Sequence, residues 1–589
     1  MIRYSTSELR AALAVPVAGD LPVPLTGPYL DGLWAEIRAE AALGADTAVP
    51  SWSLFHGYER TGDRMPYEQP YFARRGRLNA LAAAAWRDGD PAVLDDLADM
   101  VWSVCDEYTW AVPAHAYLVA GTDRTMVQCV DLFAAETAHS LAEIVTLVGD
   151  RLPAAVTDRA RTEVRRRVLA PLFGSEESWP WESVANNWAA VCAGAAGMAA
   201  LALMTDPDEL TAAVERCLRI LEVYLSGLGS DGACVEGVNY WVYGFGYFTY
   251  FAEALRARTG LDLLRDIPLA TAAAAFPAAI DIGAGQFVTF ADSSRGTPLP
   301  TGLISRLRER LGTPVPGAAQ VPRFGADHCH RWAHLSRTLT WPDEEVINAT
   351  SPEGATWLPD AAWLVDRRTI DGVQIAFAAK GGHNDESHNH LDLGHFTLSA
   401  DGEELLADLG AGSYSHGYFG PDRYTRFLHP SAQAHSVPVV SGLAQQPGRA
   451  ARAVVLNVRA DDGGCALDLD LSAAYEGRQV VRSFVWQPDG RLRLTDAFDT
   501  ATRVEELFIS RLEPQLAEGT ATWTGTSAGV TMSYDAAAWR PAVERVETVG
   551  HFGEPETMYR LRLHALESPG ISSAVFELAV VPSVPSRVG

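Results

Sequence analysis

Three histidines and an aspartate lie within ten residues of this chain, in the segment S-H-N-H-L-D-L-G-H-F from Ser387 to Phe396. The chain has only 15 His in 589 residues, so this density indicates chemistry or metal binding. Alternate side chains of an extended strand share a face, so His388 and His390 are expected to project to the same side, followed by Asp392. Two imidazoles placed in this way can share a metal, or one can ligate while the other stays free.

Two further candidate ligands follow in the same half of the chain, Asp408 in E-L-L-A-D-L-G and His435 in S-A-Q-A-H-S-V. With His390 they form a set of the kind that Zn²⁺ accepts, with water or a fourth group completing a tetrahedron. The gaps of 18 and 27 residues match no compact metal motif. The alternative from spacing alone is that these histidines cap turns or hydrogen-bond to backbone carbonyls.

Tyrosines are concentrated in E-G-V-N-Y-W-V-Y-G-F-G-Y-F. If this segment is helical, Glu236, Tyr240, Tyr243 and Tyr247 line one face. Such a wall suits sugar stacking, and also proton transfer by a tyrosine whose pKa is lowered by neighbouring cations. The alternative is an aromatic core stripe with hydroxyls at its edge.

Two other segments carry candidate binding residues. In A-N-N-W, Asn186 or Asn187 can cap the helix that follows, or the amides can donate to a carboxylate. In Y-F-G-P-D-R-Y, Tyr418 and Arg423 lie on the loop that leads to His435. Gly and Pro predict that this loop is an exposed turn, where functional residues often lie.

Helical periodicity dominates from about residue 28 to 285, in segments such as 72–87, 187–204 and 239–258. So many consecutive helices with short loops predict a solenoid or a closed toroid. After residue 345, alternating strands and Asp-Gly turns predict antiparallel sheets packed face to face. The predicted domains are therefore a helical toroid at 1–345 and an antiparallel β-sandwich at 346–589, with a further division near 510 as an alternative. Ligands commonly bind between such domains.

Bulk composition excludes some classes of partner. The formal charge of −27 argues against nucleic acid and anionic membranes, which both require a surplus of Lys and Arg. Seven scattered Cys without a C-x-x-C motif are typical of reduced thiols. Without an apolar leader or a stretch of about 18 apolar residues, the sequence predicts a cytoplasmic protein.

Taken together, these motifs resemble the heparinase II/III-like polysaccharide lyases, including exo-acting alginate and oligouronide lyases. The similar parts are N-N-W-A-A-V-C, E-G-V-N-Y-W-V-Y-G, S-H-N-H-L-D-L-G-H-F and a downstream A-H-S. The resemblance implies an (α/α) toroid with a β-sandwich, and an enzyme that cleaves uronic-acid-containing glycans by β-elimination. Alginate and glycosaminoglycans are both substrates of such enzymes, and the acidic chain favours short oligosaccharides over a highly sulfated polymer.

The resemblance also implies roles for individual residues. Asn187 would neutralise the uronate carboxylate, Tyr240 would transfer protons, and His388 would act as the opposing base or stabilise charge. Tyr240 and His388 are then expected to face each other across a gap the size of one sugar. The remaining predicted residues bind substrate (Asn186, Glu236, Tyr243, Tyr418 and Arg423) or hold a structural zinc ion (His390, Asp408 and His435).

Two other functions fit the same residues. A uronyl C5-epimerase removes the same proton but returns one to the opposite face. A sugar-binding protein can keep the fold without activity. Endo or exo cleavage, syn or anti elimination, and the oligomeric state stay open at this point.

Overall fold

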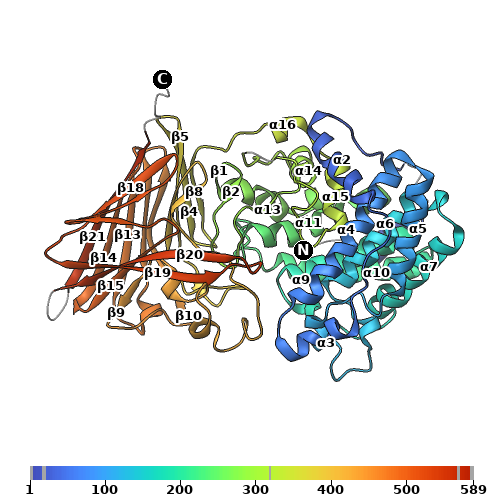
Figure 1. Cartoon of the computed structure of the whole chain (residues 1–589), viewed down its shortest axis with the longest axis horizontal. Coiled ribbons are helices and arrows are strands. Elements are labelled where there is room, and N and C mark those ends of the chain that lie inside the picture. Colours follow the sequence, from blue (N-terminus) through green and yellow to red (C-terminus); the bar gives the residue numbers. More distant parts are fainter. Residues whose placement is uncertain (1–3, 16–20, 318–319, 567–570, 584–589) are drawn as a thin grey trace.

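A computed structural model of the chain describes residues 4–15, 21–317, 320–566 and 571–583. A helical part comes first and an antiparallel β part follows, side by side along the long axis of the molecule (Figure 1). The predicted fold class is therefore confirmed. The change from helices to strands falls between Ile347 and Gly354. The division into domains at residue 345 stays a prediction.

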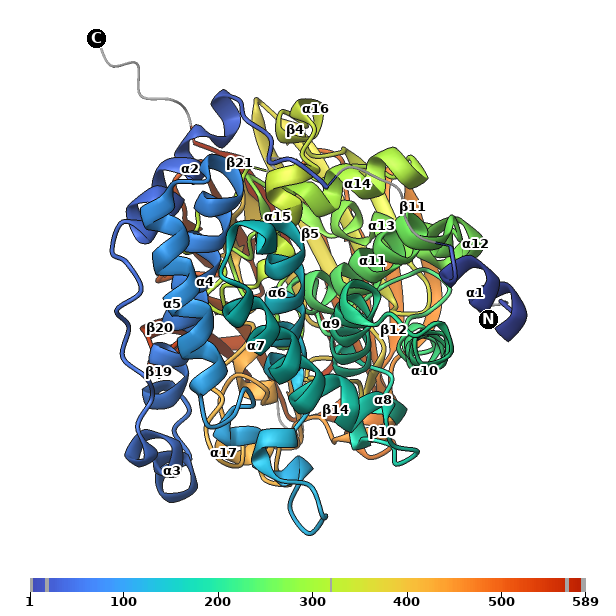
Figure 2. The same cartoon turned by 90° about the vertical axis from the view of Figure 1, so that its right-hand side faces the viewer.

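The helical part is a toroid of helices that lie in front of the sheets when viewed from the helical end (Figure 2). Its helices begin where the sequence supplies caps. For example, Asp90 and Asp206 each accept backbone N–H groups and are followed by proline at the first helical position. The helices are α1 (Thr6–Leu13), α2 (Pro28–Ala41), α3 (Trp52–Thr61), α4 (Met65–Asp88), α5 (Pro91–Asp106), α6 (Leu132–Leu147), α7 (Ala154–Val164), α8 (Ala170–Phe173), α9 (Asn187–Leu203), α10 (Pro207–Leu225), α11 (Val238–Thr259), α12 (Leu263–Asp266), α13 (Pro268–Ala279), α14 (Thr301–Leu311), α15 (Trp332–Thr340) and α16 (Glu344–Ile347).

Three large antiparallel sheets form the β part. The first is β3 (Gly354–Leu358), β4 (Trp363–Ile370), β5 (Val373–Lys380), β7 (Phe396–Ala400) and β8 (Glu403–Leu406). The second is β11 (Val454–Asp461), β12 (Gly464–Asp470), β13 (Val480–Trp486), β14 (Arg491–Thr502), β21 (Ile571–Pro582), β18 (Ala528–Ser533), β17 (Thr520–Thr524) and β16 (Gln515–Ala517). The third is β19 (Trp539–Val549), β20 (Pro555–Ala565), β15 (Val504–Ser510) and β9 (Pro438–Val440).

Short elements connect these sheets to the site. They are the pair β1 (Asp281–Gly283) and β2 (Gln286–Phe287), the pair β6 (His383–Asn384) and β10 (Gly448–Arg452), and helix α17 (Arg423–Arg426). The three predicted Asp-Gly turns join β4 to β5, β7 to β8, and β13 to β14. Gly372, Gly402 and Gly490 all have positive φ, as these tight hairpins require.

The two parts share one hydrophobic core at their junction. Trp363 and Val365 of β4 are fully buried and belong to the same cluster as the toroid helices. A second cluster fills the space between the sheets. The junction is therefore packed as firmly as a protein interior, and side chains from both parts can hold fixed positions across it.

No helix in the part of the chain that the structure describes is both long and apolar enough to cross a membrane. The predicted cytoplasmic location stays a prediction.

The loop after β2 passes between two glycines at the junction. A Cβ at Gly237, which precedes α11, would lie 2.4 Å from Cβ of Ser293. A Cβ at Gly410, which follows β8, would lie 2.1 Å from the carbonyl oxygen of Ser293. Both glycines also have positive φ. Only glycine allows the three segments to approach so closely, and this approach fixes the position of the neighbouring Asp292.

We predict that Gly410→Ala destabilises the fold much more than Gly442→Ala. Gly442 also has positive φ, but a Cβ there meets no heavy atom within 4 Å. The Gly442→Ala variant therefore measures the cost of the backbone strain alone, about 1–2 kcal/mol. Gly410→Ala adds displacement of the Ser293 backbone, which should cost roughly 1–3 kcal/mol more. Urea denaturation of both variants measures the difference. Equal losses of stability would contradict the close packing at Ser293.

Candidate active site

The segment that carries His388 and His390 is a loop between β6 and β7. This differs from the extended strand that the alternating pattern predicted. His388 has φ of 58°, in the left-handed region that non-glycine residues seldom adopt. Both imidazoles nevertheless reach the same group, because hydrogen bonds to a shared partner compensate the strained backbone.

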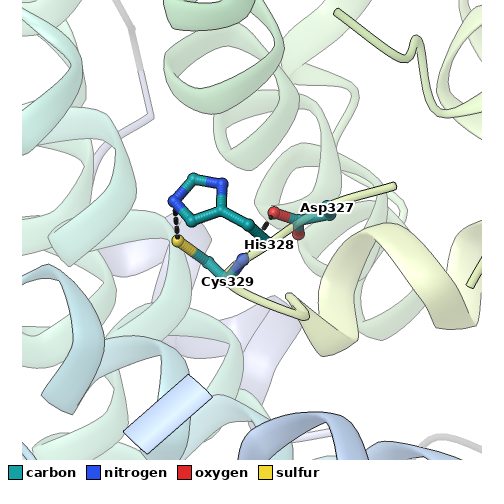
Figure 3. Close-up of side chains that lie close together, drawn as sticks. All are labelled: Asp327, His328 and Cys329. Carbon is teal, nitrogen blue, oxygen red and sulfur yellow. Dashed lines mark hydrogen bonds between the residues drawn. The ribbon is translucent and has the colours of Figure 1, made fainter. Parts of the chain in front are cut away.

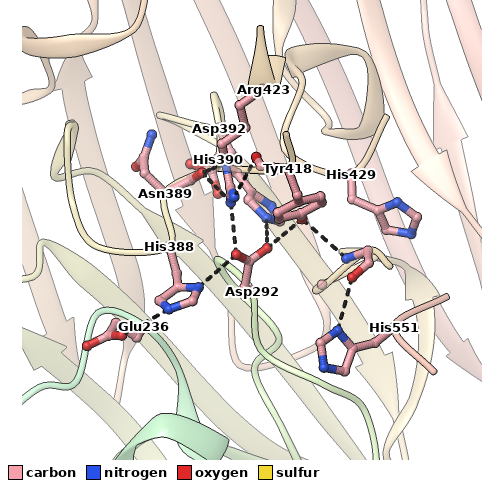
Figure 4. A network of polar contacts seen from close by, with 12 residues as sticks. Glu236, Asp292, His388, Asn389, His390, Asp392, Tyr418, Arg423, His429 and His551 are labelled. Carbon is pink, nitrogen blue, oxygen red and sulfur yellow. Dashed lines mark hydrogen bonds and ion pairs between the residues drawn. The ribbon is translucent and has the colours of Figure 1, made fainter. Parts of the chain in front are cut away.

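That shared partner is Asp292, in the loop between β2 and α14 (Figure 4). His388 Nδ1 lies 2.9 Å from its Oδ2, and His390 Nε2 lies 2.9 Å from its Oδ1. The Tyr418 hydroxyl donates to Oδ1 at 2.7 Å, and Arg423 Nη2 donates to Oδ2 at 2.9 Å. Each carboxylate oxygen therefore has two partners, and the aspartate is completely buried.

This environment keeps Asp292 ionised. Burial alone would raise the pKa of its carboxyl group, but hydrogen bonds from His388 and His390 and the charge of Arg423 hold that pKa well below its usual range.

Tyr418 and Arg423 are occupied by this carboxylate. Both side chains are buried, with Tyr418 only 1% exposed, although the turn between them is exposed at Phe419, Pro421 and Asp422 as predicted. Arg423 also donates to the backbone carbonyl of Asn389. The two side chains support the histidine loop, and their predicted contacts to substrate stay a prediction.

A chain of hydrogen bonds joins the helical part to His388. The Tyr240 and Tyr414 hydroxyls lie 2.6 Å apart, and the Tyr414 hydroxyl lies 3.2 Å from His388 Nδ1. The ring centroids of Tyr240 and His388 are 4.2 Å apart. The predicted pair is therefore brought together, but the rings touch, and no sugar fits between them. His388 is 15% exposed and Tyr240 is half-buried, so both rings keep some contact with solvent.

Burial changes the protonation expected for Tyr240. The sequence predicted a pKa lowered by cations, yet burial and the nearby charge of Asp292 raise the pKa of this phenol well above its ordinary value. The one nearby cation, Arg423, is already neutralised by Asp292. Tyr240 is therefore a protonated phenol, suited to donate a proton rather than to remove one.

Glu236 lies before α11, not on it, because the helix begins at Val238. Its Oε2 is 3.5 Å from His388 Nε2, so the predicted proximity to the site holds even though the predicted helical stripe does not. Burial raises the pKa of the Glu236 carboxyl, despite the opposing effect of His388.

Tyr243 points elsewhere. Arg331 stacks over its ring at 4.1 Å, and Arg331 pairs with the buried Glu136. Burial raises the pKa of Glu136 to about 7. Tyr243 therefore contributes to the interior of the toroid, and its predicted contact to substrate stays a prediction.

Asn186 and Asn187 begin α9. Asn186 caps the helix, since its Oδ1 accepts the N–H of Trp188. Asn187 is buried, and its amide oxygen has no hydrogen-bond partner among the described residues. Gly194 of α9 packs against the Tyr247 carbonyl of α11. Gly194 lies seven residues after Asn187, and Tyr247 lies seven residues after Tyr240. The two helices thus begin at the same end, which brings Asn187 towards the site.

The predicted metal ligands converge. One donor atom from each of His390, Asp408 and His435 lies within 4.8 Å of the others, and all three residues are completely buried. His390 Nδ1, Asp408 Oδ2 and His435 Nδ1 have no hydrogen-bond partner, which is costly in a protein interior. His435 Nδ1 and Asp408 Oδ2 are 3.6 Å apart, near the separation of about 3.4 Å expected for two ligands of one tetrahedral zinc ion. These residues fit a metal ion.

Hydrogen bonds behind these ligands orient them. His435 Nε2 lies 3.0 Å from the His429 carbonyl, and His390 Nε2 faces Asp292. His395 Nδ1 accepts the Ser436 N–H at 2.8 Å, so the neutral ring carries its proton on Nε2, 3.3 Å from Asp408 Oδ2. This Nε2 makes no hydrogen bond to Asp408 among the described residues, and it has no free lone pair for a metal.

A second cluster, Asp327, His328 and Cys329, differs from the first (Figure 3). Both Asp327 oxygens already accept hydrogen bonds, from Arg331 and from the backbone N–H of Cys329. Cys329 Sγ lies 3.2 Å from His328 Nε2, and burial keeps the pKa of the thiol well above its usual value. The cluster closes a turn before α15 and lacks the free lone pairs of the His390 group.

No sequence motif points to Asp292 or Tyr414. Asp292 is one of 74 acidic residues and stands in F-A-D-S-S-R, which contains no motif. Tyr414 follows β8 in a Gly- and Ser-rich loop. Only the chain's fold brings these residues to His388.

The chain thus combines a helical toroid, antiparallel sheets and a polar cluster at their junction. Residues 350–565 match the family model described as heparinase II/III-like, C-terminal. The β part is therefore heparinase II/III-like, and the predicted resemblance is confirmed. None of the curated proteins matches the sequence of this chain.

Solved structures share the fold over nearly the whole chain. Heparan sulfate lyase HepC from Pedobacter heparinus has a TM-score of 0.62 at 13% identity, covering 98% of this chain and 87% of its own. A heparinase III structure has a TM-score of 0.63 at 12% identity, covering 98% and 89%. A chondroitin AC lyase mutant from Streptomyces coelicolor A3 has a TM-score of 0.51 at 15% identity, covering 99% and 83%.

Proposed function

We propose that this protein is a polysaccharide lyase that cleaves uronate-containing glycans by β-elimination and leaves a C4–C5 unsaturated uronate. The observation that carries the proposal is the contact between Tyr240 and His388, which are joined through Tyr414 and are both partly exposed. Elimination needs a base for the C5 proton, an acid for the departing O4, and a group that neutralises the carboxylate.

The residues support distinct roles. His388 is the base, because its exposed edge can accept the C5 proton. Tyr240 is the acid, because burial keeps its phenol protonated. Asn187 neutralises the substrate carboxylate through its side-chain amide, which can donate hydrogen bonds to an anion. Glu236 lies beside His388, and we assign Asn186 together with it to the wall that the sugar meets.

The contact between the two rings favours syn elimination. A base and an acid on one side of the sugar reach a C5 proton and an O4 that lie on the same face of the ring. Glucuronate and mannuronate have this configuration, whereas guluronate and galacturonate place the two groups on opposite faces. We therefore propose a substrate of the first kind.

We also propose that His390, Asp408 and His435 hold a structural divalent ion, with zinc the best match to two imidazoles and one carboxylate. The positive charge of the ion would hold together three segments that carry its ligands, namely the histidine loop, the end of β8 and the segment before β9. Its ligands lie beside the catalytic loop, and His388 is only two residues from His390.

We expect the purified protein to produce absorbance at roughly 230–235 nm from glucuronate- or mannuronate-containing oligosaccharides, because elimination creates a conjugated double bond. Oligosaccharides of hyaluronan, chondroitin, heparin and alginate form the panel, with polyguluronate as the trans-configured control. Deuterium incorporation at C5 without this absorbance would identify an epimerase instead. Binding without either signal would identify a non-catalytic sugar-binding protein.

Tyr240→Phe and His388→Gln should each lower kcat by about 10²–10⁴-fold, the usual contribution of a general acid or base. Tyr250→Phe is the matched control, since Tyr250 lies on the same helix and its hydroxyl bonds His334 inside the toroid. Steady-state kinetics on the best substrate measure the effect. If Tyr240→Phe kept the activity of the Tyr250→Phe control, the acid role would be rejected.

Metal analysis of the purified protein should find about one zinc ion per chain. His435→Ala should lose the ion, because two ligands cannot hold it tightly, while His328→Ala in the second cluster should retain it. Mass spectrometry of the native protein and elemental analysis measure both. A metal-free preparation with unaltered stability and activity would contradict the metal proposal.

A further inference from the structure

One carboxylate faces two histidines that are two residues apart, and it faces a different nitrogen of each. Asp292 Oδ2 lies 2.9 Å from Nδ1 of His388, and Oδ1 lies 2.9 Å from Nε2 of His390. The carboxylate is paired with Arg423 and accepts the Tyr418 hydroxyl. An ionised carboxylate can only accept hydrogen bonds, so both imidazole nitrogens that face it must carry a proton.

This requirement leaves one free nitrogen on each neutral ring. In His390 the proton stands on Nε2, and Nδ1 keeps its lone pair. Nδ1 is the atom that lacks a hydrogen-bond partner and lies near Asp408 and His435. In His388 the proton stands on Nδ1, and Nε2 keeps its lone pair, directed towards Glu236 and the exposed edge.

The same proton sets the direction of the neighbouring hydrogen bonds. His388 Nδ1–H also faces the Tyr414 hydroxyl oxygen at 3.2 Å, so Tyr414 accepts there. The Tyr414 proton is then free for donation to Tyr240, 2.6 Å away. With this direction Tyr240 accepts from Tyr414, and its own O–H is left free to point away from this chain of bonds.

We propose that Asp292 is a positioning residue that holds His388 and His390 in opposite tautomers, the first ready to accept a proton and the second ready to bind a metal. The proposal deepens the proposed function, because it assigns His388 Nε2 as the basic atom and the Tyr240 O–H as the acidic one. It also explains why the loop tolerates the left-handed conformation of His388, since that conformation turns Nδ1 towards Asp292.

The test is ¹⁵N NMR of the histidine rings in the full-length protein as purified, with His388 and His390 signals assigned by loss in His388→Gln and His390→Gln. We expect a proton on Nδ1 of His388 and on Nε2 of His390 in the wild type. This measurement needs neither substrate nor activity. A His388 ring protonated on Nε2 alone would overturn the proposal.

Asp292→Asn provides the second arm, because the amide nitrogen can donate to His388 and so favour the other tautomer. We expect the His388 signal to switch to Nε2–H, and kcat to fall by up to about 10⁴-fold with little change in KM, as for other histidines placed in the wrong tautomer. An unchanged His388 signal in this variant would overturn the proposal.

Asp496→Asn is the matched control. Asp496 is also completely buried and paired with an arginine, Arg482 at 2.7 Å, but it faces no histidine. Asp496→Asn should leave the tautomers of His388 and His390 unchanged. The same change of tautomer in Asp292→Asn and Asp496→Asn would overturn the specific role of Asp292. If the tautomers are as proposed but no uronate glycan is cleaved, the proposed function fails while this inference stands.

Discussion

The buried carboxylate of Asp292 is the constraint on which the site depends. A charge in a protein interior is tolerated only when it is paired and hydrogen-bonded, and Asp292 meets this condition with one arginine, one tyrosine and two histidines. The aspartate belongs to the segment between β2 and α14, whereas all four partners follow β6. The need to satisfy one charge therefore locks the toroid to the sheets where Tyr240 and His388 meet.

Much of the architecture could be predicted because it is specified locally. Helix α9 begins at the predicted residue, since Asn186 caps it, and α11 begins at Val238, one residue before the predicted start. The Asp-Gly hairpins are equally local, because two residues set the turn. The convergence of His390, Asp408 and His435 could be predicted only through resemblance, since no spacing rule brings together the loop before β7, the end of β8 and the segment before β9.

What could not be predicted depends on contacts between distant segments. Asp292 lies 98 positions before His390, and Tyr414 lies 174 positions after Tyr240. The sequence predicted a tyrosine pKa lowered by cations, but the fold assigns Arg423 to Asp292 and buries Tyr240, so desolvation dominates and the pKa rises. Tyr418 and Arg423, predicted on an exposed turn, instead bond the buried carboxylate of Asp292.

The pairing of the arginines also bears on the size of the substrate. Arg295, Arg331, Arg423 and Arg511, from segments near the junction, each have a carboxylate partner. A long polyanion would have to displace these partners and approach a chain of net charge −27. A short uronate oligosaccharide brings few charges, and neutral amides such as that of Asn187, together with an imidazole, can balance one carboxylate at the reacting sugar. The charge distribution therefore favours short oligosaccharides over extended sulfated polymers.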